Sequence, residues 1–576
     1  MTALPEWADP AVPENDLDPQ GLNRRGLLKR AGLFGAAFAA TSALPAAAPA
    51  AAAPVAAAPA DATSIAATSA AAARVATSPA PSATSSADHD PELVYLVGDH
   101  HVHTQYSHDA KYTLAQAARR GAQFGLDWMV VTEHSNFGHE NIGAAQEHTE
   151  ILNARAENPR LLIFQGLEWY IPGAEHATVF TPPGEHEVDV LRQFEQVYDG
   201  KLNARTEGTA TNEALAVAAI KWLAVQKSSG YVSDALMLAN HPSRLGIDAP
   251  HEIRAWRDAA PELMIGMEGA PGAQGAALPG LRGPNSIRGE YENKPSAQSH
   301  PGYPAEAYVT YGGFDWMTAT VGGMWDALLA EGRLFSITTN SDNHRTVHDT
   351  LRNGDFPAGA TFDSLGKVPD PIETGVEQAG SDFWPGQFSR THVGVTRYGY
   401  REVMAGLRAG RVWVDHGQLV DGLDVRLSSE HGRSATLGGR LRARRGERIT
   451  LTVTVDSASR PNFHGVLPRL AHLDVIRGVV TGRPPADPDS WRAPDTRVVE
   501  TVDVSRRSGR FTIRISLGKV SSSGYVRVRG SDGNRHGAGL LGARIDPHGP
   551  IAHTPGDGDP WLDTWLYANP IFIDVV

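Results

Sequence analysis

The sequence predicts an α/β protein in which a closed or nearly closed barrel of seven strand-and-helix units is followed by an antiparallel β-sandwich. Two observations predict the barrel. Short apolar runs alternate with helix-compatible stretches through the middle of the chain, and most of these runs end in a side chain that can bind a metal. A third observation predicts the sandwich, because after residue 417 the helical pattern gives way to short strands separated by turn residues.

The composition is that of a soluble protein with a large core. The chain has 576 residues, of which 41% are hydrophobic and 20% are charged, and its formal net charge is -13. Because no long stripe of Lys and Arg offsets the acidic excess, nucleic acid is not expected as a partner. The chain has no cysteine, so any bound metal must be held by His, Asp and Glu.

Residues 1–50 are predicted to be an export signal. The segment 23–29 reads Asn-Arg-Arg-Gly-Leu-Leu-Lys, and an apolar stretch at 31–44 and small residues follow it, which is the layout of a signal peptide. The segment resembles a twin-arginine signal, with Asn23 in place of Ser or Thr and Leu27 in place of Phe. The alternative is a chance arginine pair before a membrane anchor, although the stretch is short for a spanning helix. The resemblance implies a secreted or cell-envelope protein, exported already folded by the twin-arginine machinery, with no stable transmembrane span after processing.

Residues 51–90 are predicted to be a disordered linker. They are mostly Ala, Pro, Ser and Thr, a composition that buries too little apolar surface to offset the entropy lost on ordering. The recurrent prolines argue against the alternative, a long alanine helix.

Residues 91–417 are predicted to form the barrel. Its first strand runs into the segment Gly98–Asp109, which places His101, His103 and His108 at the rim of a sheet. The strands show little polar alternation, so both of their faces are expected to be buried between helices. The predicted strands are 93–97, 127–132, 161–164, 235–240, 263–267, 333–339 and 392–396, and helix-compatible stretches include 113–124, 212–226 and 400–409.

Candidate metal ligands follow all but the last of these strands. Because the carboxyl ends of barrel strands converge on one mouth, residues far apart in the sequence are expected to share one pocket. A single His at a strand end can equally be a hydrogen-bonded core or surface residue, so the prediction depends on the recurrence. The later candidates are His134, Glu168, His176, His241, Glu268, Asp342 and His344, with His176 expected in a loop and Glu268 open as a ligand or a structural acceptor.

These blocks resemble the PHP (polymerase and histidinol phosphatase) superfamily of metal-dependent phosphoesterases. The resemblance covers roughly 91–417 and implies a distorted (β/α)7 barrel that holds two or three divalent ions of zinc, manganese or iron. The blocks are Asp99-x-His101-x-His103-Thr104, Thr132-Glu133-His134, Gly166-x-Glu168, His241-Pro242 and Ser341-Asp342-x-His344.

The resemblance also assigns roles to single residues. It makes His101 and His103 ligands of one ion, which Glu168 bridges to a second. His176 and His241 would hold another ion, His134 would serve the outer ion, and Asp342 and His344 would close the site. The chain departs from the family pattern at His108, where many members have Asp. This leaves open whether His108 or Asp109 is the ligand, and Glu133 also stands where Asp is more usual.

Two arginines are candidates for substrate binding. Arg244 lies shortly after His241, and Arg345 directly follows His344. A guanidinium at the mouth could reach an anionic group of the substrate, and the alternative for each arginine is a solvated surface charge. Insertions at 281–304 and 353–387 are expected to be lids or binding loops that select the substrate.

Residues 418–576 are predicted to form the β-sandwich. They contain no cluster of potential ligands, so a packing module is expected, with carbohydrate or cell-wall binding as the alternative. The predicted strands are 423–427, 448–455, 473–479, 509–517 and 524–529, with a last strand within 565–573.

The expected function is that of an exported metal-dependent hydrolase. Two bridged ions would lower the pKa of a shared water toward neutrality and stabilise charge on the attacked oxygen. A small-molecule phosphoester is the first choice of substrate, because the PHP family is chiefly phosphoesterase. One alternative is a carboxyl ester or carbamate, since exported PHP-like proteins with a β tail also resemble carbaryl hydrolase. Another is a non-catalytic, metal-dependent binding protein of the cell envelope.

Overall fold

The structure, a computed structural model, describes residues 93–107, 110, 112–135, 138–140, 144–272, 294–344, 383–552 and 560–576. The predicted export signal at 1–50 and the predicted linker at 51–90 lie outside the described residues. The same holds for His108, Asp109 and Arg345, and for most of the two predicted substrate loops.

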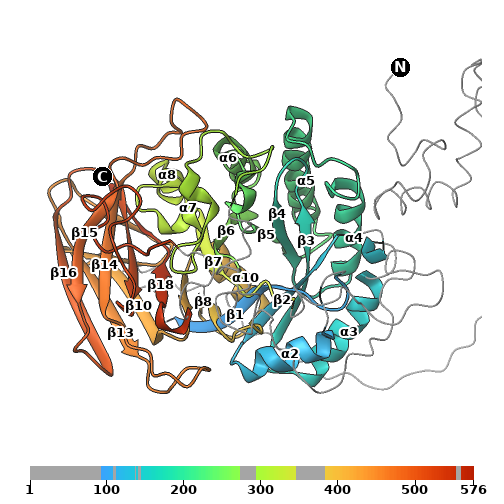
Figure 1. Ribbon diagram of the computed structural model, residues 1–576, viewed down its shortest axis with the longest axis horizontal. Coiled ribbons are helices and arrows are strands. Elements are labelled where there is room, and N and C mark those ends of the chain that lie inside the picture. Colours follow the sequence, from blue (N-terminus) through green and yellow to red (C-terminus); the bar gives the residue numbers. More distant parts are fainter. Residues whose placement is uncertain are drawn as a thin grey trace, which may run out of the picture. The chain divides into compact units, whose positions relative to one another are not determined.

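The strands between residues 94 and 395 lie in one sheet in the order β8-β1-β2-β3-β4-β5-β6-β7 (Figure 1). β1, β2 and β3 are parallel, and so are β5, β6 and β7. However, β4 is antiparallel to β3 and β5, and β8 is antiparallel to β1. The prediction of parallel pairing throughout is therefore wrong at β8 and at β4, a strand that the sequence prediction missed. The strands are β1 Val94–Val102, β2 Trp128–His134, β3 Leu162–Tyr170, β4 His176–Thr181, β5 Leu236–Ala239, β6 Met264–Ala270, β7 Ser336–Thr339 and β8 Ser389–Val395.

Helices pack beside these strands, and α2, α5 and α10 form where the sequence predicted helices. Thr113 caps the amino end of α2: its side chain accepts a hydrogen bond from the Gln116 N–H, while the Gln116 side chain accepts one from the Thr113 N–H. β2 is buried along its whole length, as expected of a strand covered on both faces. The α-helices are α2 Leu114–Gln123, α3 Ala144–Glu157, α4 Glu187–Tyr198, α5 Ala210–Ser228, α6 Pro250–Ala259, α7 Trp316–Ala319, α8 Met324–Ala330 and α10 Tyr400–Arg408, and short 3-10 helices are η5 Arg244–Gly246, η7 Ala305–Tyr308 and η8 Pro560–Leu562.

This sheet does not close into a barrel by backbone pairing. The antiparallel β8 occupies the edge of β1 that a closing strand would need, and among the described residues no strand pairs with the outer edge of β7. An isolated parallel bridge links Val102, the last residue of β1, to Asn343 beyond β7, and the His103 N–H donates to the Asn343 carbonyl at 3.0 Å. The prediction of a closed or nearly closed barrel of seven units is therefore corrected to an open sheet.

Two side chains take the place of the missing neighbour of β7, and we call them the side-chain seam. Thr391 of β8 accepts from the Thr339 N–H at 2.8 Å and donates to the Thr339 carbonyl at 2.6 Å. Asn569 accepts from the Ile337 N–H at 2.9 Å and donates to the Ile337 carbonyl at 3.1 Å. The seam satisfies backbone groups that would otherwise be buried without a partner.

The region after residue 417 is rich in strands, as predicted. A four-stranded sheet has the order β11-β10-β13-β16, and a second group of strands belongs to the large sheet. Residues of both sheets share one buried hydrophobic cluster, for example Val425 of β10 and Val526 of β17. The strands are β9 Val412–His416, β10 Val420–Ser429, β11 Ser434–Thr436, β12 Arg440–Ala443, β13 Arg448–Ser457, β14 His472–Val479, β15 Arg497–Asp503, β16 Arg510–Lys519, β17 Gly524–Ser531, β18 Trp565–Ala568 and β19 Ile571–Val575.

Strand pairing continues across residue 417. β9 pairs with β8 on one side and with β18 on the other, so the large sheet runs without a break into the C-terminal region. All described residues belong to one unit, 88–576. The single strand predicted within 565–573 is two strands, β18 and β19, because Asn569 and Pro570 interrupt it and Pro570 has no N–H to donate.

A buried ion pair joins α8 to the C-terminal region, next to which α8 lies in Figure 1. The carboxylate of Asp326 accepts from Arg527 Nε at 2.9 Å and Nη2 at 2.7 Å. It also accepts from the Tyr525 hydroxyl and the Gly322 N–H. Both charged side chains are at most 1% exposed, so each depends on the other for its stability in the interior.

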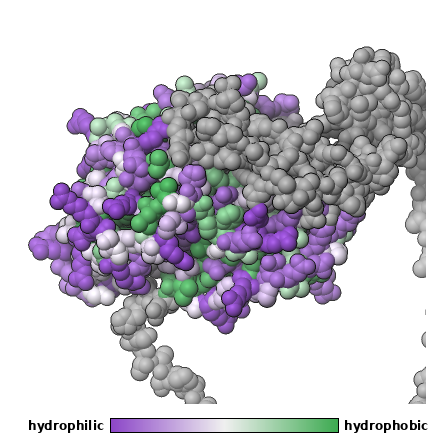
Figure 2. All heavy atoms as spheres, turned by 60° about the horizontal axis from the view of Figure 1, so that its bottom comes forward, coloured by the Kyte–Doolittle hydropathy of each residue, from purple (hydrophilic) through white to green (hydrophobic). Residues whose placement is uncertain are grey.

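The surface has the mixed character of an ordinary globular protein. On the face shown in Figure 2 hydrophilic residues predominate among those described, and hydrophobic residues gather near its middle. A cavity of about 890 Å³ lies between α6, α8 and the chain after β14, and none of the candidate ligands lines it. In the part of the chain that the structure describes, no helix is both long enough and apolar enough to cross a membrane.

Candidate metal centre

The structure brings the described candidate ligands together at one end of the sheet. None of them is more than 8% exposed. Parallel strands β1, β2, β3, β5 and β7 carry their candidates at or just beyond their carboxyl ends, as the sequence predicted. The residues are His101, His103, His134, Glu168, His176, His241, Asp342 and His344.

His176 reaches the site from a strand, and the prediction of a loop is wrong. It is the first residue of β4, and it pairs with Tyr170 of β3. Because β4 is antiparallel to β3, its amino end lies at the rim where the parallel strands end. The prediction failed because no strand was predicted at 176–181.

Three groups of side chains among the described residues have ligand atoms close enough to share an ion. In each group the atoms lie within 4.8 Å of one another. We call them the first group (His101, His103, Asp342), the second group (Glu168, His176, His241) and the third group (His103, His134, His344).

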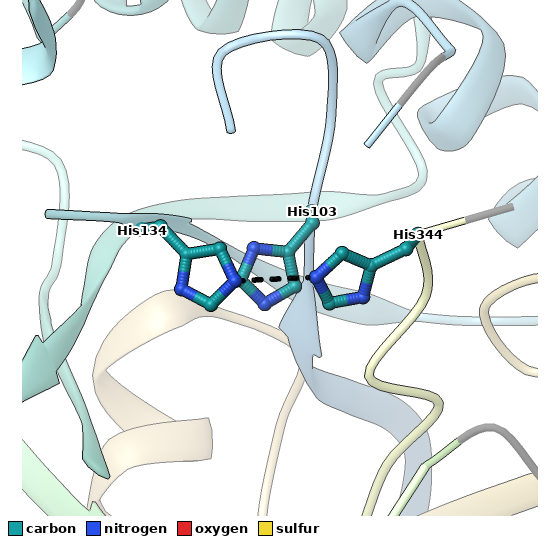
Figure 3. A group of neighbouring side chains, drawn as sticks. All are labelled: His103, His134 and His344. Carbon is teal, nitrogen blue, oxygen red and sulfur yellow. Dashed lines mark hydrogen bonds between the residues drawn. The ribbon is translucent and has the colours of Figure 1, made fainter. Parts of the chain in front are cut away.

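The third group consists of imidazoles alone (Figure 3). Nε2 of His134 lies 3.3 Å from Nε2 of His344, and the His103 ring stacks on the His344 ring with centroids 4.0 Å apart. The remaining nitrogen of His344, Nδ1, lies 3.0 Å from the Asp342 carbonyl oxygen. A carbonyl can only accept, so Nδ1 carries the proton and Nε2 presents its lone pair to the group.

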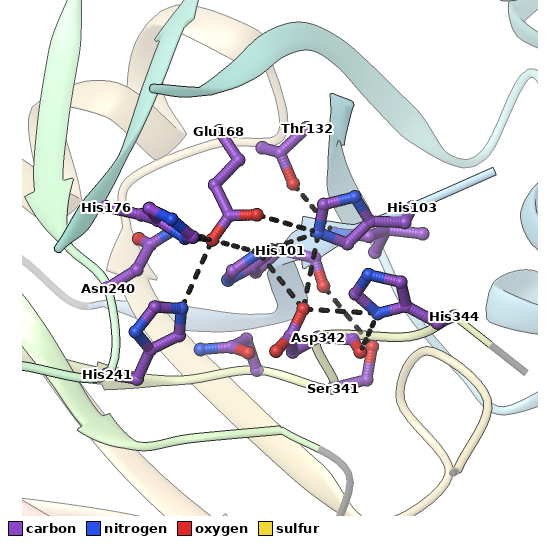
Figure 4. A network of polar contacts seen from close by, with 12 residues as sticks. His101, His103, Thr132, Glu168, His176, Asn240, His241, Ser341, Asp342 and His344 are labelled. Carbon is purple, nitrogen blue, oxygen red and sulfur yellow. Dashed lines mark hydrogen bonds and ion pairs between the residues drawn. The ribbon is translucent and has the colours of Figure 1, made fainter. Parts of the chain in front are cut away.

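The first group brings two imidazole nitrogens face to face (Figure 4). Nε2 of His101 and Nε2 of His103 are 2.9 Å apart, and each lies 3.2 to 3.3 Å from Asp342 Oδ1. On its far side, His101 Nδ1 is 2.6 Å from a carboxylate oxygen of Glu268, so Nδ1 carries the proton.

His103 is fixed in the same tautomer through Ser107. Its Nδ1 is 2.9 Å from Ser107 Oγ, whose own proton is donated to Glu133 at 2.5 Å. Nδ1 of His103 must therefore be the donor to Ser107, and Nε2 has the lone pair. Without a bound metal, the positive charge that these two nitrogens and the carboxylate require is a proton on His101, and a metal ion can replace that proton.

The pKa values of His101 and Asp342 also indicate a site that attracts positive charge. Burial opposes protonation of His101, but Asp342, Glu168 and Glu268 outweigh it and raise the pKa of His101 well above its ordinary value. Burial alone would raise the pKa of Asp342, but His101, His103 and His344 hold it well below its usual range. The group therefore keeps its carboxylate ionised and attracts positive charge.

Glu168 contacts members of all three groups. Its Oε1 lies 2.9 Å from His176 Nδ1, 3.2 Å from His241 Nε2 and 3.2 Å from His101 Nε2. Its Oε2 lies 2.8 Å from His134 Nδ1 and forms no hydrogen bond, although it is buried. Burial would raise the pKa of Glu168, but the surrounding histidines hold it well below its ordinary value. One ionised carboxylate thus lies at the centre of the site.

Two candidate ligands have left-handed backbone conformations. The φ angle is 28° at His241 and 44° at Asp342. Such conformations cost non-glycine residues roughly 1–3 kcal/mol and persist only where the surroundings enforce them. Both residues follow a strand end and turn their side chains into the site, so local strain accompanies the placement of these two groups.

Sequence reasoning missed several side chains that support the site. Asn240 donates to Glu168 Oε1 at 3.1 Å, and the Tyr170 hydroxyl lies 3.2 Å from His134 Nδ1. Lys201 donates to the same Tyr170 hydroxyl at 3.1 Å. Tyr170 follows Glu168 by two residues on β3, and Asn240 precedes His241, so closeness to a ligand in sequence was the available signal. Nothing in the sequence pointed to Lys201.

Arg244 lies at the edge of the second group. Its Nη1 is 3.2 Å from Glu175 Oε2, and the same oxygen is 3.6 Å from His241 Nδ1. The side chain is 28% exposed, so part of it reaches solvent while Glu175 holds it beside the site. The other three predicted site residues or alternatives, His108, Asp109 and Arg345, lie outside the described residues.

The donor set fits divalent metal ions. Imidazole and carboxylate ligands without sulfur suit zinc, manganese and iron. Asp342 Oδ1 of the first group and Oε2 of Glu168 are buried without a hydrogen bond, and a cation would satisfy both.

Comparison with known proteins agrees with the sequence resemblance over part of the chain. Residues 99–241 match the PHP domain, a range that holds the candidates from His101 to His241 but not Asp342 and His344. No curated protein matches the chain significantly.

Two solved structures are similar at low identity. One is a two-domain protein from Bacteroides vulgatus that contains a predicted PHP-like metal-dependent phosphoesterase. It has 13% sequence identity and a TM-score of 0.30, and the match covers 81% of this chain and 97% of that protein. The other is a candidate metal-dependent phosphoesterase from Bifidobacterium adolescentis. It has 14% sequence identity and a TM-score of 0.17, and the match covers 30% of this chain and 76% of that protein.

Proposed function

We propose that this protein is a metal-dependent hydrolase of ester bonds, with a small-molecule phosphoester as the first choice of substrate. The observation that carries the proposal is the position of Glu168, an ionised and buried carboxylate in contact with all three ligand groups. The PHP domain match over 99–241 supports it. A carboxylate shared between ligand groups is the feature that a centre with more than one ion needs.

The roles proposed for the ligands follow the three groups. The first group would hold one ion and the second group another, with Glu168 shared between them, and the third group would hold an outer ion if His108 or Asp109 completes it. Zinc, manganese or iron would suit these ligands. When bound, such ions would lower the pKa of water and stabilise negative charge on the oxygens bonded to the phosphorus that is attacked.

The chain's own residues would hold and orient this chemistry. Glu268 and Ser107 fix the tautomers of His101 and His103, so that both lone pairs face inward. Arg244 and Lys201 would offer positive charge at the edge of the site to an anionic substrate. Because the candidate ligands are buried, bulk water has limited access to them.

The proposal is tested by metal analysis of the purified full-length protein together with three substrates. p-Nitrophenyl phosphate, bis(p-nitrophenyl) phosphate and p-nitrophenyl acetate distinguish phosphomonoester, phosphodiester and carboxyl-ester turnover. We expect bound metal and turnover of a phosphate ester. Turnover of the acetate alone would instead favour a carboxyl-ester or carbamate hydrolase of the carbaryl-hydrolase type. Bound metal without any turnover would favour a metal-dependent binding protein.

Replacing Arg244 with alanine is expected to lower kcat/KM for an anionic ester by about tenfold or more, the value of one charged hydrogen bond, and to leave the metal content unchanged. The measurement is steady-state kinetics with metal analysis of the same sample. Arg510→Ala, at an exposed arginine of β16, is the matched control and should change neither quantity. An unchanged kcat/KM in Arg244→Ala would remove Arg244 from the substrate site.

We also propose that the protein is exported by the twin-arginine machinery and acts outside the cytoplasm, with 51–90 as a linker before the regions at 91–417 and 418–576. The support is the Arg24-Arg25 pair ahead of the apolar stretch.

Changing both arginines to lysine is expected to leave the precursor in the cytoplasm, as seen by immunoblotting of cell fractions. The pair Arg119-Arg120 of α2 gives the control, since its double lysine variant should be exported normally. Normal export of the Arg24/Arg25 variant would contradict the proposal.

A further inference from the structure

Glu268 contacts two candidate ligands that belong to different groups. It lies on β6 and is fully buried. Its Oε1 is 2.6 Å from Nδ1 of His101, a member of the first group. Its Oε2 accepts a hydrogen bond of 2.5 Å from the backbone N–H of His241, a member of the second group. Both carboxylate oxygens are therefore engaged, each by a different ligand residue.

On the His101 side, Glu268 decides which nitrogen faces the site. A carboxylate oxygen at 2.6 Å keeps a proton on Nδ1, so Nε2 is the nitrogen that faces His103, Asp342 and Glu168 and can bind an ion once its own proton is lost. A carboxylate behind a metal-binding imidazole also makes the imidazole more basic and fixes its ring orientation.

On the His241 side, Glu268 holds a strained backbone. The φ angle of 28° at His241 is unfavourable for a residue with a side chain, and the bond from its N–H to Glu268 helps to keep it there. In this conformation His241 Nε2 reaches Glu168 at 3.2 Å. Without the anchor the backbone could relax and carry the imidazole out of the second group.

We propose that Glu268 is a positioning residue that couples the first and second ligand groups, so that ordering of one group prepares the other for its ion. This inference rests on the metal binding in the proposed function, but not on hydrolysis. Binding at His101 Nε2 makes Nδ1–H a stronger donor and so fixes the Glu268 carboxylate, which in turn fixes His241. The second ion then binds to side chains that are already ordered, so its binding loses less conformational entropy.

Glutamine at position 268 is a sharp probe, because it has the same shape but only one acceptor oxygen. If its oxygen faces His101, its NH2 group meets the His241 N–H, and two donors face each other. If it is flipped, the NH2 group requires a lone pair on His101 Nδ1, which moves the proton to Nε2 and blocks the ligand atom. Either orientation disturbs one group directly, and through the coupling the other as well.

Ser107→Ala is the matched comparison. Ser107 also supports a ligand from behind, but among the candidate ligands its Oγ contacts only the ring of His103 and the backbone of His134. It does not contact any residue of the second group in the described structure. Its loss should therefore weaken the binding of the ions held by His103 and leave unchanged the affinity for the ion held by Glu168, His176 and His241.

The test is a titration of metal-free full-length protein with Co²⁺. Binding is measured by the visible absorption of the bound ion and by calorimetry. The proteins compared are wild type, Glu268→Gln, Glu268→Asp and Ser107→Ala. We expect Glu268→Gln to weaken both the first and the second binding step by about 10–100-fold, the usual effect of losing such a support. Ser107→Ala should leave one step at the wild-type affinity. Circular dichroism checks folding, and Glu268→Asp keeps the charge and both acceptors if the Gln variant does not fold.

The outcomes separate the coupling from the rest of the proposal. Wild-type affinities in Glu268→Gln, or loss confined to a single step, would overturn the coupling. If Glu268→Gln does not fold, wild-type affinities in Glu268→Asp would do the same, because the shorter side chain cannot span both contacts unchanged. Wild-type protein that binds Co²⁺ in the expected steps but hydrolyses no ester would contradict the hydrolase while the role of Glu268 stands.

Discussion

Replacing Glu168 with glutamine is expected to remove bound metal and ester hydrolysis together. The amide keeps the volume of the side chain but loses the negative charge that lies among five histidines. Two dications close together repel each other strongly, and no neutral side chain offsets that repulsion. We expect metal affinity and kcat/KM each to fall at least about 100-fold, the upper end of the effect of removing an outer support.

The measurement is metal stoichiometry after dialysis, with turnover of the best substrate on the same sample. Glu500→Gln, at an exposed carboxylate of β15, is the control for the chemical change and should behave as wild type. Asp342→Asn should act in the same direction as Glu168→Gln but more weakly, because Asp342 belongs to one group only. Full stoichiometry and normal turnover in Glu168→Gln would rule out a shared carboxylate.

Replacing Asp326 with alanine is expected to destabilise the protein by about 3–5 kcal/mol, because the change leaves Arg527 buried without its counter-charge. The hydroxyl of Tyr525 and the N–H of Gly322 lose an acceptor as well. Urea denaturation measures the effect, and limited proteolysis would show whether the C-terminal region loosens from α8.

The exposed pair of Asp456 and Arg510 provides the contrast for this prediction. Their side chains are 38% and 71% exposed, so Asp456→Ala should cost no more than about 1 kcal/mol. Equal effects of the two substitutions would mean that burial does not set the strength of the Asp326 contact.

The sequence predicted which candidate ligands would lie together better than it predicted the sheet that holds them. Candidates such as His134 and His241 stand within a few residues of the end of an apolar run, a signal that can be read from the sequence alone. Strand direction has no comparable local signal. A strand was predicted where β8 lies, but not its antiparallel pairing with β1, which prevents closure. β4 was not predicted as a strand at all, so neither its direction nor the place of His176 could be predicted.

The supports of the site were harder to predict than its ligands. Ser107 and Glu133 act through side-chain distances that depend on the finished packing. Glu268 was open as a ligand or an acceptor, and only the 2.6 Å and 2.5 Å contacts show that it accepts from two ligand residues at once. Lys201 comes from a turn after α4 with no pattern of its own, so only the fold places it near His134.

The side-chain seam has a consequence for the order of events during synthesis. Asn569 completes the hydrogen bonds of Ile337, which precedes it by 232 residues. At about 5–20 residues per second, roughly 10–50 seconds pass between synthesis of the strand and synthesis of its partner. During that interval the outer edge of β7 lacks part of its covering, and an open strand edge can pair with another chain. Until residue 569 has left the ribosome, the nascent protein therefore exposes part of this edge to pairing with other chains.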